Sequence, residues 1–551
     1  HGYAVLAVAW QGDVLPGDER MTIRLPVARQ EDGTSLTGCI RAEFIVDKPT
    51  ACLPLSGKHP THSYPAASLD PHQATLVRRR YPDSTPEPIS ADRWAFALVQ
   101  GAGRVPGVVG DLTGGEQGLV PSPAHLTMQD GFQPGWIYQL TYTARDPLVL
   151  DLGFLAVRDA VSALRHEADT PLRGRIEKAY CWGRSQSGRA IRDFLHRGFN
   201  ADAAGRRVFD GMLSHIAGAG KTTMNRFSNL VLPAARQYED HLNPGDRFPF
   251  SYAASTDHLT GRTEAILSRP ATDPLVIHTQ TASEYWQRRG SLVHTDTQGN
   301  DLPQPENVRI YAWVSSQHWA DPLLRAPQRG NSQNYPNVVA TSFFFRATLV
   351  LLDRWASFGD APPGSRVPNQ MDGTLVDFET WRKAFPAIPG LALPRDVNPL
   401  CVIDYGPDYE SGREIREPPV VHADRAYSVL VPRSDADGND LGGLRAPMVQ
   451  APLGTYTGWN LRARGQGHGA LHDFIGSYIP LPETADERRH TGDPRSSIVE
   501  RYGDPAAYVS AIREAAERLA AERFILAEDV ERATAAAADW GRPRHDVRLP
   551  D

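Results

Sequence analysis

The heptapeptide Gly183-Arg184-Ser185-Gln186-Ser187-Gly188-Arg189 lies between a short apolar run, Ile176 to Trp182, and an amphipathic stretch. This order predicts a strand, a sharp turn and a helix, with a serine at the apex of the turn. In a nucleophile elbow, a strained turn of this kind projects a serine hydroxyl away from the backbone. The heptapeptide therefore indicates an α/β fold built around a reactive serine.

Two serines of the heptapeptide compete for the apex of the turn. The backbone passes close on both sides of the apex, so the residues two before and two after it must be small. Around Ser185 these residues are Gly183 and Ser187, whereas an apex at Ser187 would put Arg189 at a crowded position. The pattern favours Ser185 as the nucleophile. The alternative is a Ser-rich helix N-terminus whose hydroxyls only cap backbone amides.

The other members of a triad are sought by chain order. In this fold the acid and the histidine follow the serine, each on a loop after a later strand. After the strand predicted from residue 275, residues 279–286 contain one carboxylate, Glu284. After the strand predicted from residue 308, residues 315–319 contain one imidazole, His318. Glu284 would orient His318 and stabilise its cation when His318 takes the proton of Ser185.

Alternatives remain for both roles. Glu284 could be an N-cap partner or an acid in the pocket wall, with Asp273 or Asp296 as the orienting acid instead. Three further histidines compete for the role of the base: His215, His278 and His294. The first two lie at the ends of predicted strands, where structural histidines are common. His318 alone combines the chain order with a helix predicted after it.

The oxyanion hole and the pocket are less well defined. The residue after the nucleophile opens the helix, so the N–H of Gln186 is the predicted first oxyanion donor. The second donor normally comes from a loop after an earlier strand. The turn Trp10-Gln11-Gly12 lies at the appropriate end of the predicted sheet, although it also resembles the loop of a following strand. We expect four residues in the substrate pocket: Trp10, Gln11, Tyr285 and Trp319.

Composition excludes some classes of partner. The 551-residue chain has a formal net charge of -7, from 58 basic and 65 acidic residues, and no long basic cluster, so nucleic acid is not an expected partner. The most apolar stretch, residues 338–352, contains Arg346 at its centre, which indicates a buried helix rather than a membrane span. The expected partner is a small-molecule ester, and the predicted chemistry requires no cofactor.

The cysteines do not predict a metal site. Cys39, Cys52, Cys181 and Cys401 lack the paired spacing of zinc ligands. Cys39 and Cys52 lie close together in strand-like sequence, and they would either form a disulfide in an oxidising compartment or stay reduced.

The segment Asp435-Ala436-Asp437-Gly438-Asn439-Asp440 allows two interpretations. Hard oxygen ligands on alternating residues, with a glycine at the bend, are typical of a calcium loop. Asp-Gly and Asn also favour a tight turn between two strands. The catalytic site predicted at Ser185, Glu284 and His318 contains no metal.

We expect residues 1–360 to form the catalytic domain, with a mostly parallel central sheet flanked by helices. A strand is predicted at residues 4–10. β-Rich inserted material occupies about residues 14–148 and begins with a hairpin of residues 21–27 and 39–46. Helical spacing begins at Leu152.

Two further segments complete the expected organisation. Residues 221–272 are irregular and form a candidate lid, in which Tyr238, Phe248, Phe250 and Tyr252 would line a pocket or pack within the insertion. Residues 361–551 form a C-terminal extension packed on the catalytic domain.

Long strings of the chain resemble a known family. They are GYAVLAVAWQGD, YTARDPLVLDLGFLAVRDAVSALRH, AYCWGRSQSGRAIRDFLHRGFN, TASEYWQRRGSLVHTD, DADGNDLGG and GTYTGWNLR. They look like the "alpha/beta hydrolase domain-containing" family, a branch of large bacterial serine hydrolases, and the similarity runs over nearly the whole chain. The resemblance implies triad positions at Ser185, Glu284 and His318, and hydrolysis of carboxylic esters.

The resemblance names no substrate, because the fold hosts esterases, lactonases, peptidases and non-catalytic members. The expected activity is ester hydrolysis through an acyl-enzyme on Ser185. The alternatives are a peptidase, amidase or lactonase with the same triad, or an inactive binding or scaffold protein. Relatives have a further strand and an Asn-Arg-Gly-type loop ahead of the position of Gly2. The resemblance thus implies that the chain starts inside the domain, and it leaves the second oxyanion donor unassigned.

Overall fold

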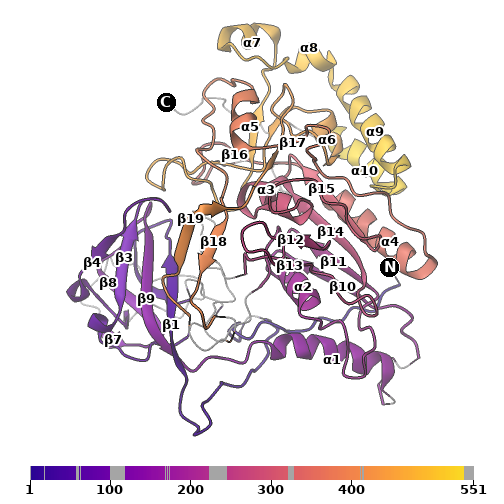
Figure 1. Ribbon diagram of the computed structural model, residues 1–551. Coiled ribbons are helices and arrows are strands. Elements are labelled where there is room, and N and C mark those ends of the chain that lie inside the picture. Colours follow the sequence, from indigo (N-terminus) through magenta and orange to yellow (C-terminus); the bar gives the residue numbers. More distant parts are fainter. Residues whose placement is uncertain are drawn as a thin grey trace.

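The computed structural model describes residues 2–17, 19–56, 61, 64–99, 118–167, 169–170, 172, 174–222, 245–319, 328–409, 411 and 415–538. Two bodies of strands are visible in Figure 1, a central sheet with helices on both faces and a group of antiparallel strands at its left. The C-terminal helices lie at the top and right of this view.

The central sheet has five strands in the order β10-β11-β14-β15-β21, and all neighbouring pairs are parallel. Its strands are β10 (Tyr180–Arg184), β11 (Gly211–His215), β14 (Leu275–Thr281), β15 (Val308–Val314) and β21 (Leu444–Arg445). The carboxyl ends of parallel strands share one edge of a sheet, where ligands bind in open α/β sheets. Ser185, Glu284 and His318 all follow such ends, and the predicted parallel sheet is confirmed.

Side-chain alternation along the strands divides the core into two layers. Met212, Val276 and Ile310 face one side and pack with helices α1 (Leu152–His166) and α2 (Gln186–His196). Leu213, Ile277 and Tyr311 are their neighbours in sequence, and they face the other side.

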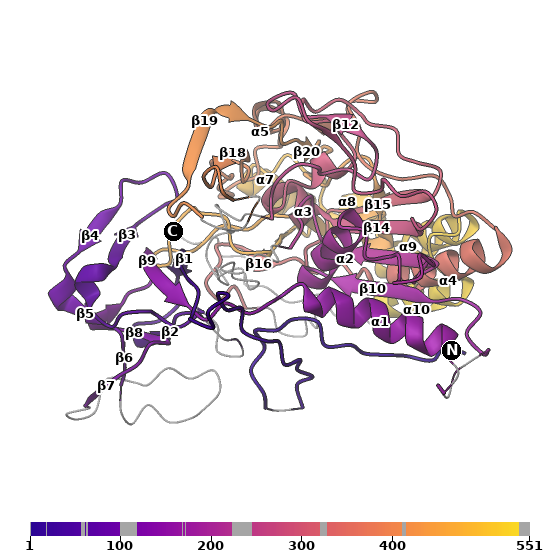
Figure 2. The ribbon, with the colours of Figure 1, turned by 60° about the horizontal axis from the view of Figure 1, so that its bottom comes forward.

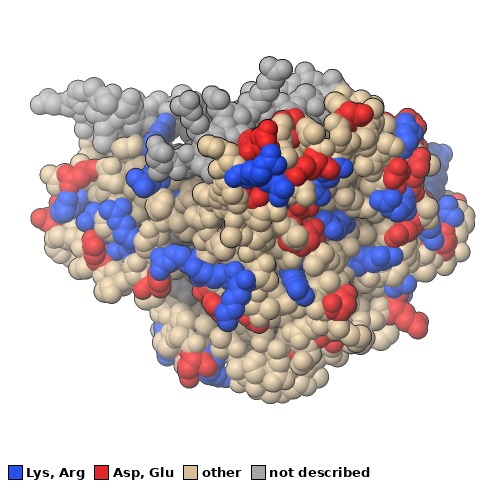
Figure 3. All heavy atoms as spheres, turned by 90° about the horizontal axis from the view of Figure 1, so that it is seen from above, with Lys and Arg blue, Asp and Glu red and all other residues tan. Residues whose placement is uncertain are grey.

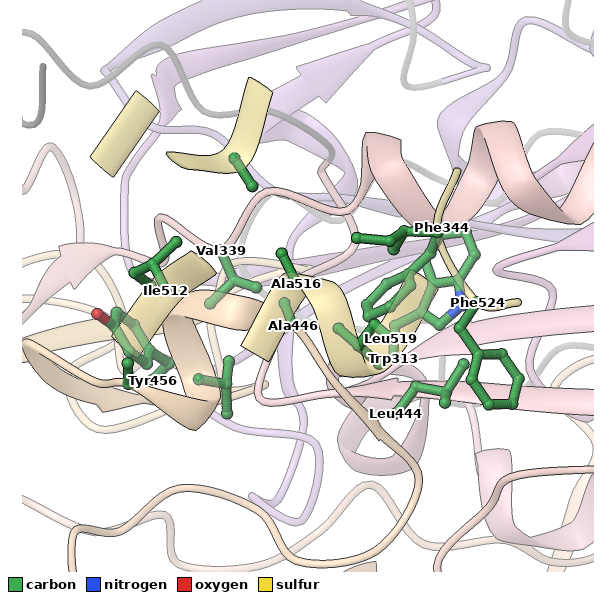
Figure 4. Packing of buried hydrophobic residues seen from close by; sticks show 14 of the residues in the cluster. Trp313, Val339, Phe344, Leu444, Ala446, Tyr456, Ile512, Ala516, Leu519 and Phe524 are labelled. Atoms are coloured by element: carbon green, nitrogen blue, oxygen red, sulfur yellow. The ribbon is translucent and has the colours of Figure 1, made fainter. Parts of the chain in front are cut away.

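The second layer contains the long helix α4 (Ser342–Phe358) and the C-terminal pair α9 (Pro505–Ala521) and α10 (Ala527–Ala538). In Figure 4, Trp313 of β15 lies with Phe344 of α4, and Leu519 of α9 is near both. Strands buried on both faces read as nearly continuous apolar runs, which is why these strands were recognisable in the sequence.

The antiparallel strands form a separate sandwich with its own core, confirming the β-rich interpretation of this region. One sheet has the order β1-β9-β3-β4 and the other β2-β8-β5, with β6 and β7 as a further pair. Aromatic rings from both sheets meet inside the sandwich. The ring centroid of Phe132 lies 6.1 Å from that of Phe44 and 4.9 Å from that of Tyr138. The strands are β1 (Thr37–Phe44), β2 (Thr50–Pro54), β3 (Thr75–Arg79), β4 (Glu87–Ile89), β5 (Trp94–Ala95), β6 (Ala97–Val99), β7 (Leu119–Pro121), β8 (His125–Phe132) and β9 (Ile137–Arg145).

The chain beyond residue 360 contacts both the central sheet and the antiparallel sandwich. β21 extends the central sheet beside β15, and buried Arg462 bonds Asp47 of the sandwich at 2.9 Å. The remaining strands are short: β12 (Ser255–Thr256), β13 (Thr263–Glu264), β16 (Tyr335–Pro336), β17 (Leu375–Val376), β18 (Cys401–Asp404), β19 (Val420–Ala426), β20 (Val431–Pro432), β22 (Gly454–Tyr456) and β23 (Ser477–Pro480). The remaining helices are α3 (Ala282–Gln287), α5 (Phe378–Ala384), α6 (Pro447–Gln450), α7 (Ala485–Thr491) and α8 (Ile498–Tyr502).

Two sequence expectations near the N-terminus are wrong. Residues 4–10 form no strand; they run as an extended segment past α1, as Figure 2 shows. Residues 21–27 do not pair with β1, because β1 pairs with β9 instead. Local alternation marked strand-like sequence correctly at β1 but could not identify its partner, which is a long-range property.

The structure shows the state of the four cysteines and the location of three aromatic residues of the candidate lid. All four cysteines are free thiols, and Cys39 and Cys52 lie in different sheets. Tyr238 lies outside the described residues, whereas Phe248, Phe250 and Tyr252 are buried in the core layer of α2. These three aromatic residues therefore pack inside the protein, which is the second of the two roles considered for them.

One face of the molecule carries charges of both signs. On the face in Figure 3, Lys and Arg side chains are interspersed with Asp and Glu side chains. In the described part of the chain, no helix combines the length and the apolar character that crossing a membrane requires.

Candidate active site

Ser185 occupies a strained turn between β10 and α2. Its backbone has φ 56° and ψ -114°, a conformation that non-glycine residues rarely adopt and that is typical of functional sites. The Ser185 N–H donates to the His215 carbonyl at the end of the neighbouring strand (2.8 Å). This bond holds the turn against the sheet.

Glycines are required on both sides of this turn. A Cβ on Gly183 would lie 2.3 Å from the carbonyl oxygen of Ser187, and a Cβ on Gly188 would lie 2.7 Å from that of His215. Both distances are far below a van der Waals contact. The close approach expected two residues before Ser185 is therefore present, and Gly188 adds a second one that the sequence analysis did not identify.

Ser185, His318 and Glu284 form a continuous chain of two hydrogen-bond contacts. His318 Nε2 lies 3.0 Å from Ser185 Oγ, and His318 Nδ1 lies 2.6 Å from Glu284 Oε1. Glu284 is fully buried and His318 is 3% exposed, so water does not compete for the contact between them. This geometry suits a base that takes a proton from the serine hydroxyl and an acid that orients the base.

The second oxygen of Glu284 caps the helix that carries it. Oε2 accepts the Thr281 N–H (2.6 Å) and the Thr281 hydroxyl (2.5 Å), which completes a capping box at the start of α3. One oxygen of the Glu284 carboxylate is thus a cap partner, and the other contacts His318. The cap fixes the rotation of the carboxylate that faces His318.

Residues later in the chain hold the loop that carries His318. At its start, Ser315 has φ 57°, its N–H donates to Asp440 Oδ2 (2.7 Å), and its Oγ accepts the Asp440 N–H (2.7 Å). Burial raises the pKa of the Asp440 carboxyl to about 7. Asn337 Nδ2 donates to the Ser315 carbonyl (2.8 Å), and Gln317 Oε1 accepts the Gly476 N–H (3.0 Å).

Aromatic rings surround His318. Phe474 stacks on its imidazole, with ring centroids 4.2 Å apart and an interplanar angle of 22°. Trp319, predicted to line the pocket, is 48% exposed and lies edge-on to His318. Arg184, next to the serine, donates to the His318 carbonyl (3.2 Å).

A family model described as "alpha/beta hydrolase domain" matches residues 119–535, well over half of the chain. The chain belongs to this family. Membership indicates a hydrolase in general. Comparison with curated proteins and with solved structures found no match.

The matched range of this alpha/beta hydrolase begins within the sandwich and continues past residue 360. It includes the strand and loops that hold His318 from the C-terminal side, namely β21, Asp440 and Phe474.

The competing histidines of the alpha/beta hydrolase have other partners. His215 Nδ1 bonds Thr279, His278 Nδ1 bonds Tyr252, and His294 Nε2 bonds Tyr285. Burial lowers the pKa of all three imidazoles, as expected of neutral structural histidines. The competing acids each accept backbone N–H groups of local turns, Asp273 from Arg269 and Asp296 from Gln298 and Asn300.

Two of the residues expected in the substrate pocket contact other parts of the protein. Tyr285 is fully buried, and its hydroxyl bonds His294 in the interior rather than facing a pocket. Trp10 packs its ring on Phe154 of α1, and its carbonyl occupies the space beside Gly153. Tyr285 was expected in the pocket because it follows Glu284, and Trp10 because its turn lies at one end of the predicted sheet; neither position determines the direction of a side chain. Gln11, next to Trp10, is half-buried. Gln186 is the first residue of α2, and its role as oxyanion donor stays a prediction.

The oxygen-rich segment at residues 435–440 is a tight turn. Asp435 Oδ1 accepts the N–H groups of Asp437 and Asn439, and its Oδ2 accepts from Arg445. Among the described residues, no group of three or more His, Cys, Asp and Glu side chains is arranged to hold a metal ion.

Proposed function

We propose that this alpha/beta hydrolase is a serine carboxylic-ester hydrolase that forms an acyl-enzyme on Ser185. The observation that carries the proposal is the 3.0 Å contact between Ser185 Oγ and His318 Nε2 at a strained strand-to-helix turn. A structural serine has no need of positive φ or of an imidazole backed by a buried carboxylate.

In the proposed mechanism His318 acts first as a base and then as an acid. Ser185 Oγ attacks the ester carbonyl carbon while His318 takes the hydroxyl proton, and the Gln186 N–H stabilises the oxyanion that forms. The C–O bond to the alcohol then breaks, and His318 returns the proton to the leaving oxygen. A water molecule, deprotonated by His318, then attacks the acyl carbon. The bond from that carbon to Ser185 Oγ breaks, His318 returns the proton to Oγ, and the carboxylic acid leaves.

Glu284 supports both steps without taking the proton. Its Oε1 stabilises the imidazolium that each step forms, and its Oε2 is committed to the cap of α3. Because both members of the pair are buried, the attraction between them is weakly screened by water.

Labelling with a fluorophosphonate tests this proposal, since only an activated serine reacts. We expect the wild-type protein to be labelled and Ser185→Ala to be inert, with Ser187→Ala labelled at close to the wild-type rate. A folded wild-type protein that is not labelled would indicate the binding or scaffold alternative. Rates on matched aryl esters, anilides and lactones then separate an esterase from an amidase and a lactonase.

A further inference from the structure

The environment of His318 includes an aromatic residue that no triad requires. The Phe474 ring lies nearly parallel to the imidazole, with 4.2 Å between the ring centroids. Ser185 and Glu284 contact the imidazole at its two nitrogens, which lie on the edge of the ring. Phe474 instead covers a face, and so restrains a tilt of the imidazole that the two nitrogen contacts leave less restricted.

Phe474 is held in this position by its backbone. Its φ of 57° lies in the left-handed region, where a bulky side chain is strained. The Phe474 N–H donates to Gln287 Oε1 (2.8 Å), and Gln287 Nε2 donates to the His472 carbonyl (3.1 Å). Gln287 is fully buried and is the last residue of α3, the helix that also carries Glu284. One short helix thus positions both the acid and the stacking ring against His318.

The stacked ring also has an electrostatic effect. The face of an aromatic ring carries partial negative charge, which attracts a cation placed over it. His318 becomes a cation in each transition state of the proposed mechanism. A ring in this place therefore favours the charged form of His318 over the neutral form, in addition to fixing its orientation.

We propose that Phe474 is a positioning residue for His318, which fixes the imidazole plane and stabilises the imidazolium formed during catalysis. This inference rests on the proposed function. It also assigns a role in the reaction to the segment between β22 and β23, far from the triad in sequence.

The test compares Phe474→Leu with Phe474→Tyr. Leucine keeps an apolar cover without an aromatic face, whereas tyrosine keeps the face. We expect Phe474→Leu to lower kcat about tenfold with KM changed less than twofold, and to move the acidic limb of the kcat/KM profile to lower pH by about 0.5 to 1 unit. Phe474→Tyr should retain kcat within about threefold of the wild type.

A matched control is Phe378→Leu, which removes a phenylalanine stacked on Trp381 in α5 and should leave kcat and the pH profile unchanged. If Phe474→Leu does not fold, pentafluorophenylalanine at position 474 replaces it, because this residue keeps the shape and reverses the charge of the face. It should move the acidic limb in the same direction as leucine.

The outcomes separate the two proposals. An active enzyme in which Phe474→Leu keeps the wild-type kcat and acidic limb would overturn the role of Phe474 alone. A loss confined to KM, or an equal loss in Phe474→Tyr, would overturn it as well. Absence of Ser185-dependent fluorophosphonate labelling in the wild type would contradict the proposed function, and the role of Phe474 with it.

Discussion

Glu284 contacts His318 through one carboxylate oxygen, at 2.6 Å, and caps its own helix through the other. An amide at this position has one acceptor end and one donor end, so its two ends cannot accept hydrogen bonds from Thr281 and from His318 Nδ1 together. The chemistry of position 284 is therefore more restricted than either role alone would require.

Glu284→Gln is expected to lower kcat roughly 10⁴-fold, because an amide favours the wrong tautomer of His318 and does not stabilise its cation. The measurement is kcat on a short-chain aryl ester, with circular dichroism to show that the fold is retained. Asp296→Asn is the control, since that carboxylate serves an exposed turn. Near-normal rates in Glu284→Gln would assign the role of the acid to another residue.

Ser185→Ala is expected to lower kcat on the order of 10⁶-fold, as removal of a triad nucleophile does. Ser187→Ala should retain most activity, because Ser187 lies in the first turn of α2 and its contribution to the elbow is a backbone carbonyl. Steady-state rates of both variants on one ester decide the register of the elbow. An inactive Ser187 variant beside an active Ser185 variant would show the assignment to be wrong.

Gly183→Ala is expected to disrupt the elbow, because the new Cβ would lie 2.3 Å from a backbone oxygen that cannot rotate away. We expect a loss of about 1 to 3 kcal/mol in the free energy of unfolding and at least a tenfold loss of kcat through displacement of Ser185. Gly364→Ala is the matched control, since nothing lies within 4 Å of its Cβ position. Equal denaturation midpoints and rates for the two variants would contradict this prediction.

Asp440 should make stability depend on pH. Burial raises the pKa of its carboxyl from 3.8 to about 7, so the folded protein keeps a proton that the unfolded chain releases. The stabilising contribution of this group is fully present below about pH 4 and is lost as the pH rises through about 7. The difference between the two pKa values corresponds to a change of at most about 4 kcal/mol in the free energy of unfolding.

Asp440→Asn removes this titration and keeps an oxygen that can accept the Ser315 N–H. Denaturant unfolding of both proteins at several pH values measures the difference in free energy of unfolding. This difference should shift in favour of the variant between pH 4.5 and 8. A difference that is constant across this range would contradict the prediction.

The sequence predicted the parts of the site that depend on local pattern and chain order. The elbow around Ser185 and the strands before Glu284 and His318 are encoded in short stretches that contain their own apolar runs and turn residues. The parallel sheet follows from the same runs, because strands buried on both faces are apolar throughout.

The remaining parts depend on contacts between distant segments. Asp440 and Phe474 approach His318 from more than a hundred residues away, and neither carries a local signal for that contact. Asp440 lies in a segment that reads equally well as a turn or a calcium loop. The extended segment at residues 4–10 has strand-like composition, but β-propensity alone does not determine pairing.

The most direct test of the central claim is the mass of the protein during turnover. The enzyme is mixed with an excess of an activated aryl ester, and the release of aryl alcohol is followed while samples are quenched in acid for intact-mass and peptide analysis. The acyl-enzyme account predicts that the intact mass rises by one acyl group and that this group is on the peptide containing Ser185. Because the leaving alcohol departs before water attacks, a burst of about one equivalent of alcohol is predicted wherever deacylation is slower than acylation. Hydrolysis at the wild-type rate by Ser185→Ala, or an acyl group found on another residue, would contradict the account.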